Sequence, residues 1–207
     1  MVHMDDHGTV AATRRRNGLG RNGAHFPDQA ETHVRGLLEA LGEDPARDGL
    51  RDTPARVLRS LREMTQGYHE DPAEILAQKF GAESREMVVL RRVPFRSLCE
   101  HHLLPFEGHA TVAYIPDDGV LGLSKLARLV RCFARRLQVQ ERMTQQIVDA
   151  LMEHGGAQGA AALVEAEHAC MRLRGVREEA TMVTSAYRGV LDAPGQRQEF
   201  LAHARNP

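Results

Sequence analysis

Cysteine and histidine residues occur in two short clusters that could share one metal ion. Cys99 and His102 are spaced C-x-x-H in "SLCEHHLLPFEGH", with His101 between them, and His168 and Cys170 stand two positions apart much later in the chain. A C-x-x-H spacing lets two side chains converge on one ion from a strand end or tight turn, and residues two apart share one face of a strand. Together the two clusters predict a metal site.

The donor types of this site favour zinc. Thiolate sulfur and imidazole nitrogen bind Zn²⁺ in preference to Mg²⁺ or Ca²⁺. Both cysteines would bind, and one of the three histidines would complete a Cys2His set that leaves a fourth position open for water. The other two histidines would remain close to the ion for proton transfer. Because zinc lowers the pKa of its bound water to about 7, this arrangement predicts a hydrolase.

Basic residues near these clusters predict an anion site. Lys125 and Arg128 fall in the first turn of a helix that would have Ser124 as its N-cap, where free N–H groups favour phosphate. A second basic cluster follows the second metal pair: Arg172, Arg174 and Arg177. A solvated helix face is the alternative interpretation of the first group, and the second cluster favours a polyphosphate ligand.

Two further residues, Glu141 and Cys132, are interpreted from their expected places in the helices. Glu141 is expected in the opening turn of the following helix, where the helix dipole alone favours a carboxylate. It could also accept two parallel N–H donors, such as guanine N1 and its exocyclic amine, and both interpretations stay open. Cys132 lies near the apolar stripe of its helix and is interpreted as a small core residue.

A helical segment is predicted over residues 27–83. Asp28 and Glu31 match a capping box at the start of a first amphipathic helix. Thr53 as N-cap and Pro54 at the first helical position predict a second one.

The remaining chain, residues 84–207, shows strands, then a helix pair, then strands. β-branched runs at 85–95 and 108–116 predict the first two strands, and the runs at 160–175 and 180–190 predict the last two. The residues between them carry the apolar stripes of two helices. This order predicts an α+β fold with two antiparallel helices on one face of an antiparallel sheet.

The overall composition excludes several partner classes. Lys and Arg number 27 against 28 Asp and Glu, so no global field favours nucleic acid or an anionic membrane. The sequence has no apolar run long enough for a membrane span or a signal peptide, so a cytoplasmic location is expected. In that reducing compartment, three cysteines are poor candidates for a disulfide framework. Residues 1–26 lack periodicity and are expected to form a disordered tail before a single catalytic domain over 27–207.

Five motifs, in order along the chain, resemble those of the zinc-dependent GTP cyclohydrolase I family. They are "GEDPARDGLRDTPARV", "SLCEHHLLPFEGHATVAYIP", "GLSKLARLV", "QVQERMTQQI" and "HACMRLRG". The resemblance implies the tunnelling fold, with an N-terminal helical segment before the strand pairs and the two helices, and a toroidal homodecamer with sites at subunit interfaces. It also implies zinc-dependent conversion of GTP to 7,8-dihydroneopterin triphosphate and formate, for a pterin, folate or deazapurine pathway.

The resemblance further implies a role for each matching residue. The zinc ligands would be Cys99, His102 and Cys170. The catalytic groups would be His101 and His168, as acid–base groups, and Ser124, in the ribose rearrangement. Guanine would be recognised by Gln140 and Glu141. The triphosphate and ribose would be contacted by Ser124, Lys125, Arg128, Arg174 and, from a neighbouring subunit, Arg56.

Three rival functions are compatible with parts of the pattern. A nitrile reductase of the same fold, acting on a deazaguanine with NADPH, would use a lone cysteine nucleophile, and the paired "CEHH" and "HAC" motifs argue against it. A non-catalytic zinc-stabilised scaffold would not need His101 and His168. A paralogue that opens the guanine ring and stops at a formamide product differs only in its product.

Overall fold

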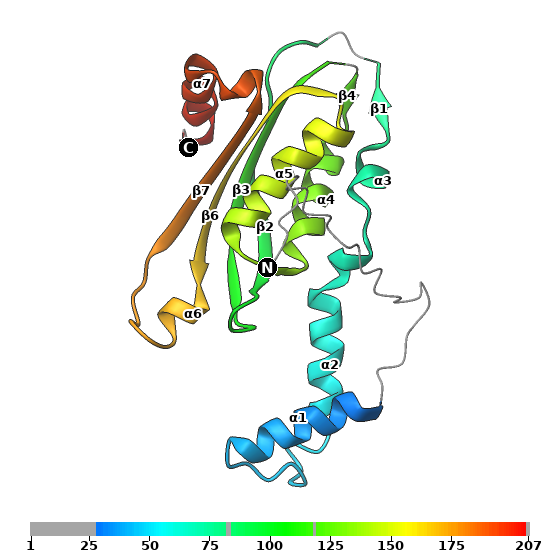
Figure 1. Cartoon of the computed structure of the whole chain (residues 1–207), viewed down its shortest axis with the longest axis vertical. Helices are drawn as coiled ribbons and strands as arrows, with labels where there is room; N and C mark the ends of the chain where they lie inside the picture. The colour runs from blue at the N-terminus through cyan, green and yellow to red at the C-terminus, as the bar shows by residue number, and fades with distance from the viewer. Residues whose placement is uncertain (1–27, 82–83, 118, 206–207) are drawn as a thin grey trace, which may run out of the picture.

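The computed structural model describes residues 28–81, 84–117 and 119–205. The tail expected over residues 1–26 lies outside these ranges. In Figure 1, two N-terminal helices project from a body that consists of a twisted sheet and the helices packed on it. Within the described residues, no helix is both long enough and apolar enough to cross a lipid bilayer.

The projecting helices are those predicted from the sequence. The elements of this segment are α1 (Asp28–Ala40), α2 (Thr53–Met64), the 3-10 helix η1 (Gln66–His69) and α3 (Pro72–Leu76). The start of α2 differs from the prediction by one residue, because Asp52 is the N-cap and Thr53 the first helical residue. Helix α1 packs on α2, α2 on η1, and η1 and α3 on the helix pair of the body.

A five-stranded sheet with the order β5-β2-β3-β6-β7 forms the body. Its strands are β2 (Val88–Cys99), β3 (Pro105–Pro116), β5 (Leu137–Gln138), β6 (Ala157–His168) and β7 (Thr181–Gly189). The four long strands pair antiparallel, and short β5 pairs in parallel with the end of β2. A separate antiparallel pair is formed by β1 (Lys79–Phe80) and β4 (Val120–Leu121). The predicted strand framework is confirmed, with β5 as an added parallel edge.

Helices pack on both faces of this sheet. The pair α4 (Leu123–Ala134) and α5 (Gln140–His154) lies on one face and forms the main core with alternate strand residues. This confirms the helix pair predicted from the sequence, and Cys132 is fully buried as predicted. On the other face lies α7 (Pro194–Arg205), reached through the 3-10 helix η2 (Val190–Asp192) and anchored by the buried Phe200.

The predicted strand over residues 160–175 is wrong at its C-terminal end. Strand β6 ends at His168, and Ala169–Arg172 form the short helix α6. The reason is the loss of strand partners, because β3 pairs with β6 only as far as Phe106 opposite His168, and β7 pairs no further than Thr181. Beyond that point the backbone satisfies its hydrogen bonds locally, in a helical turn.

The two helices of the pair begin close to their predicted positions. Gly122, and not Ser124, is the N-cap of α4, and the Lys125 N–H donates to the Gly122 carbonyl at 2.8 Å. Ser124 is therefore the second residue of the helix, with an exposed side chain. Helix α5 begins at Gln140, so Glu141 lies in its first turn as predicted.

Candidate metal centre and surrounding site

A tight turn at the end of β2 carries the first pair of predicted metal ligands. The Cys99 N–H donates to the Leu104 carbonyl at 2.9 Å, and the Cys99 carbonyl accepts from the Leu103 N–H at 2.8 Å. Leu103 closes this turn with a φ of 54°. As a result Cys99 Sγ lies 3.8 Å from His101 Nδ1 and 3.9 Å from His102 Nδ1.

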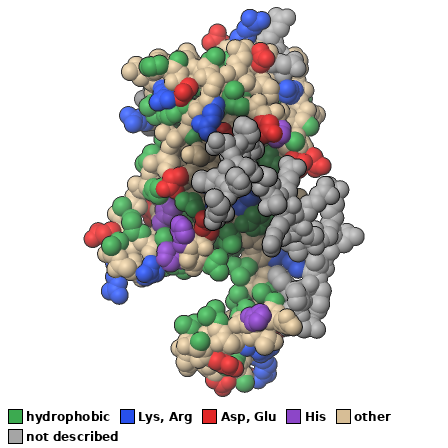
Figure 2. Space-filling view, in the orientation of Figure 1, with side chains coloured by type: hydrophobic (Ala, Val, Ile, Leu, Met, Phe, Trp, Pro, Cys, Tyr) green, Lys and Arg blue, Asp and Glu red, His purple; other side chains and the backbone are tan. Residues whose placement is uncertain are grey.

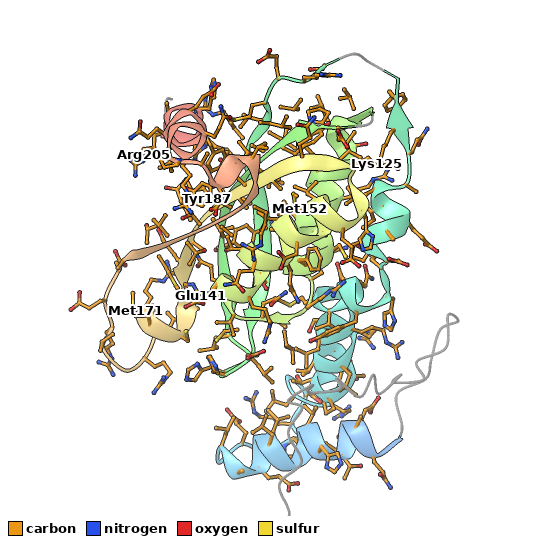
Figure 3. The ribbon with its side chains drawn as sticks, turned by 45° about the horizontal axis from the view of Figure 1, so that its top comes forward. Lys125, Glu141, Met152, Met171, Tyr187 and Arg205 are labelled. Atoms are coloured by element: carbon orange, nitrogen blue, oxygen red, sulfur yellow. The ribbon has the colours of Figure 1, made fainter. Side chains whose placement is uncertain are left out.

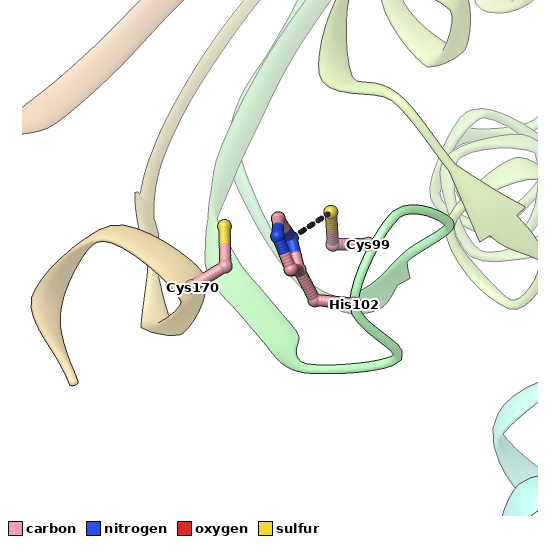
Figure 4. A group of neighbouring side chains, drawn as sticks. All are labelled: Cys99, His102 and Cys170. Atoms are coloured by element: carbon pink, nitrogen blue, oxygen red, sulfur yellow. Dashed lines mark hydrogen bonds between the residues drawn. The ribbon is translucent and has the colours of Figure 1, made fainter. Parts of the chain in front are cut away.

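Helix α6 brings Cys170 to the same point. The ligand atoms of Cys99, His102 and Cys170 all lie within 4.8 Å of one another, and the His102 ring stands between the two sulfur atoms (Figure 4). Cys99 is buried, Cys170 half-buried and His102 exposed, so the cluster opens to solvent on one side. Figure 2 shows histidine side chains gathered on the surface at this lower left part of the body.

The cluster could hold a metal ion. Two sulfur atoms and one imidazole nitrogen form a soft donor set with room for a fourth ligand on the open side. Burial, and then the neighbouring Cys99 sulfur, raise the pKa of the Cys170 thiol, and a cation between the sulfurs would favour their thiolate forms. Among the residues that the structure describes, no other group of His, Cys, Asp and Glu converges in this way.

His168 lies two residues before Cys170, at the end of β6. Its ring stacks on Phe106 with centroids 4.6 Å apart and planes 2° from parallel. Its Nε2 atom lies 2.8 Å from the Oε1 atom of Gln140. Burial lowers the pKa of His168, and the Glu141 carboxylate partly opposes this shift. The imidazole is therefore neutral near pH 7.

The start of α5 faces the cluster with one buried and one exposed side chain. Gln140 is 1% exposed, and its amide is bonded by groups of the protein itself. Glu141 is exposed, and Figure 3 shows it on the side of the body where Met171 of α6 lies. Of the two predicted guanine contacts, only the Glu141 side chain is thus open to a ligand.

An ion pair that motif spacing does not predict holds the turn after β2 against α5. Arg142 Nη2 lies 2.5 Å from Glu100 Oε2 and 3.0 Å from the Leu137 carbonyl, and Arg142 Nε donates to Gln138 Oε1 at 3.1 Å. Hydrogen bonding by Arg142 lowers the pKa of the Glu100 carboxyl. Gln138 lies in β5 and Arg142 in the first turn of α5, so no helical spacing in the sequence signals this contact.

The predicted phosphate-binding residues are divided between two ends of the molecule. Arg174 belongs to the cluster end, where its Nη1 lies 3.2 Å from His102 Nε2. Ser124, Lys125 and Arg128 lie near the start of α4, beyond the far end of β3. That strand has 12 residues and so spans roughly 36 Å. Figure 3 likewise shows Lys125 and Glu141 at different ends of the helix pair.

Arg56 also lies apart from the cluster within this chain. It is exposed on the projecting helix α2, where its Nη2 pairs with Asp52 at 3.1 Å. The main contacts of α2 are with α1 and η1. A single chain therefore brings together the predicted metal ligands, both acid–base histidines, Glu141 and Arg174, and does not bring Arg56 or the α4 residues to them.

Comparison with known proteins places this chain in one family. A family model described as GTP cyclohydrolase I matches residues 30–205. A GTP cyclohydrolase 1 of Bifidobacterium longum is 51% identical over 171 residues, covering 82% of this chain and 86% of its own. One of Corynebacterium aurimucosum is 53% identical over 165 residues, covering 78% and 84%. One of Alkalilimnicola ehrlichii is 46% identical over 183 residues, covering 87% and 99%. The chain therefore belongs to the GTP cyclohydrolase I family.

Proposed function

We propose that the chain hydrolyses and rearranges GTP to 7,8-dihydroneopterin triphosphate and releases formate. The observation that carries this proposal is the open cluster of Cys99, His102 and Cys170 with His101 and His168 beside it. Relatives that are named GTP cyclohydrolase 1 and cover most of the chain support the same reaction. The product would enter a pterin, folate or deazapurine pathway.

The metal of this site would be zinc. Cys99, His102 and Cys170 would hold it, because thiolates and imidazole are its preferred ligands and three of them leave one position free. When bound, zinc supplies Lewis-acid activation of water for attack at C8 of guanine. The exposed side of the cluster, next to His102, is where the purine ring would approach.

The two remaining histidines would move the protons of the reaction. Breaking a ring C–N bond by hydrolysis requires a proton to leave the attacking water and a proton to reach the leaving nitrogen. His168 is neutral near pH 7 because burial lowers its pKa, so it can accept a proton there. His101 is exposed beside Cys99 and can exchange protons with solvent.

Recognition of GTP would require more than one copy of the chain. Within one copy, the exposed Glu141 carboxylate could pair with guanine N1 and its amine, and Arg174 could contact a phosphate. The remaining substrate contacts lie elsewhere and would come from neighbouring copies: Ser124, Lys125, Arg128 and Arg56. Of these, Ser124 would also assist the ribose rearrangement.

Open strand edges fit such an assembly. Among the described strands, β7 forms one edge of the sheet, and β5 covers only the last two residues of β2 at the other edge. Edge strands offer unpaired N–H and C=O groups to another chain, and closure into a ring removes the edges. On α1, Leu37 and Leu41 are 59% and 72% exposed, which fits burial by another copy. We propose a toroidal homodecamer.

Formate release and dihydropterin absorbance together test the reaction. Purified, zinc-loaded protein incubated with GTP should give both signals. The His101→Ala variant should lose both and keep its zinc, whereas His109→Ala, a matched change within β3 and outside the cluster, should keep both. Formate without the pterin would show that the reaction stops after ring opening. If the protein binds zinc and gives neither signal, the proposal is contradicted and a scaffold is favoured.

A further inference from the structure

We infer that Gln140 is a positioning residue for His168, and that His168 exchanges its proton through Nδ1. This inference rests on the proposed function and departs from a direct contact between the Gln140 side chain and guanine. It depends on a buried polar network that joins α5 to β6 and β7, in which every donor and acceptor direction can be worked out.

The orientation of the Gln140 amide follows from its neighbours. Its Nε2 atom lies 3.0 Å from the Val164 carbonyl and 3.0 Å from the Met182 carbonyl. Carbonyl oxygens only accept, so the amide must present its NH2 group to them. The opposite orientation would bury an oxygen against two oxygens in a side chain that is 1% exposed, at a cost in stability. The Thr184 hydroxyl, 3.2 Å from Nε2, is a third neighbour.

This orientation determines which nitrogen of His168 carries hydrogen. The NH2 group faces the strands, so Gln140 Oε1 faces His168 Nε2 at 2.8 Å. An amide oxygen only accepts, and the Nε2 atom must therefore be the donor. In a neutral imidazole the other nitrogen then has the free lone pair. Nδ1 is thus the atom of His168 that can take a proton from the reacting groups.

The same network prevents the ring and the amide from turning. Phe106, 1% exposed, lies parallel to the His168 ring at 4.6 Å. The Thr144 hydroxyl donates to the backbone carbonyl of Gln140 at 2.7 Å and lies 2.7 Å from the Thr184 hydroxyl, which neighbours the side-chain Nε2 atom of Gln140. Such connected, buried hydrogen bonds hold side chains more strongly than single exposed ones. The His168 Nε2–H group therefore stays hydrogen-bonded to Gln140 Oε1. Protons arrive at and leave from His168 Nδ1, and no net proton enters the network.

The hydrogen bonds of the Gln140 side chain argue against a direct contact with the substrate. All of the hydrogen-bonding capacity that Gln140 shows is used inside the protein: its NH2 group by β6 and β7, and its oxygen by His168. The neighbouring Glu141 is exposed and has no such network. Replacing Gln140 should therefore impair turnover and leave the affinity for GTP nearly unchanged.

Kinetics of Gln140→Met separate the two roles. Methionine keeps the length of the side chain and removes the hydrogen bonds. We expect kcat to fall by about 10- to 100-fold, with the dissociation constant of GTP within about threefold of the wild type. The matched control Gln145→Met, on the exposed side of the same helix, should leave both unchanged. A raised dissociation constant with unchanged kcat would overturn the inference.

A double-mutant cycle tests whether Gln140 acts through His168. In a His168→Ala background, Gln140→Met should cause no further loss of kcat, because the group it positions is absent. An equal loss in both backgrounds would show a general structural effect and overturn the inference.

Nitrogen NMR of ¹⁵N-histidine-labelled protein gives a readout that needs no enzymatic activity. Measured at a pH well above the ordinary histidine pKa, with the His168 signals identified by their loss in His168→Gln, the wild type should show the Nε2–H form. An Nδ1–H form would overturn the inference. If the wild type does not convert GTP, the proposed function fails, and the NMR result still decides the orientation of His168.

Discussion

Adjacent histidines after β2 are given different surroundings by the turn that carries them. The rings of His101 and His102 lie 6.2 Å apart with planes at 77°, and each has one nitrogen near Cys99 Sγ. Only His102 also lies close to Cys170, and its second nitrogen faces Arg174. The backbone of this turn thus gives two adjacent rings different neighbours, which fits the proposal that His102 binds the metal and His101 transfers protons.

Loss of one sulfur ligand should remove the metal. Cys99→Ser is expected to reduce zinc from about one ion per chain to a small fraction, because a hydroxyl is a far poorer zinc ligand than a thiolate. Cys132→Ala changes a buried cysteine outside the cluster and should keep full zinc content. Atomic emission on dialysed protein measures both, and retention of zinc by Cys99→Ser would contradict the assigned ligand set.

The Cys132 thiol should make the protein less stable at alkaline pH. Burial raises its pKa, and the nearby Arg136 guanidinium partly opposes this. A group whose pKa is raised by folding stabilises the protein below its unfolded pKa of about 8.5, and this contribution is lost as pH rises further.

Denaturant unfolding on either side of this pH measures the effect. The free energy of unfolding of the wild type should fall more between pH about 7.5 and 9.5 than that of Cys132→Ala, because only the wild type contains the Cys132 thiol. The same slope in both proteins would show that Cys132 does not titrate differently in the folded state.

At the residue scale, motif spacing grouped the residues of the candidate metal centre and was insufficient for the residues that hold them. The two cysteines stood out because their chemistry is rare, whereas the choice of His102 among three histidines came from the family resemblance. Gln140 could not be assigned its contacts, because Val164 and Met182 reach it from strands distant in the sequence. Partners of that kind are set by strand register, which local patterns do not encode.

At the scale of elements, the close approach of β3 and β6 sets the shape of the site. At Gly108 an added Cβ would lie 1.9 Å from the Glu165 carbonyl oxygen and 2.7 Å from the Ala166 Cα. Two residues earlier on β3, Phe106 stacks on His168. The glycine therefore lets the two strands come close enough for the histidine to sit under its aromatic neighbour.

Gly108→Ala should destabilise the fold by several kcal/mol, since backbone atoms would have to move. Gly36→Ala is the matched control, because nothing lies within 4 Å of the added Cβ in the exposed helix α1. It should instead stabilise the helix by about 0.5–1 kcal/mol. Denaturant unfolding of the two variants measures the contrast, and equal effects would contradict the close-packing argument.

Amphipathic patterns predicted the helices that carry a continuous apolar stripe, and missed those that do not. The stripes of α4 and α5 identify them, since one side of each helix faces the core. Helix α7 has one fully buried side chain, Phe200, and so carries a weak pattern. Helix α6 follows a strand-like sequence, and its form is set by where β3 and β7 stop pairing with β6.

At the scale of the whole molecule, the cluster and the start of α4 lie at different ends of a long sheet. This separation predicts complementation between two inactive variants. His101→Ala and Lys125→Ala chains should each be nearly inactive alone. When they are unfolded, mixed equally and reassembled, about a quarter of the sites should combine an intact cluster from one copy with an intact Lys125 from another.

The recovered activity shows whether one copy or two copies of the chain supply the residues of each site. About a quarter of the wild-type rate in the mixture, and none in either variant reassembled alone, fits a site shared between copies. No recovery, despite reassembly of both variants to the wild-type size, would show that each chain supplies both groups to a single site.

The length of β3 also affects how a damaged allele would act when a normal allele is expressed with it. If the two ends of one chain serve two different sites, an allele that damages both ends spoils its own site and a neighbour's. In a cell that makes damaged and normal chains equally, about a quarter of the sites would then be intact, against about half for an allele damaged at one end. In such a shared-site assembly, a strand that keeps two functional ends apart would make an allele damaged at both ends more harmful to its normal counterpart than one damaged at a single end.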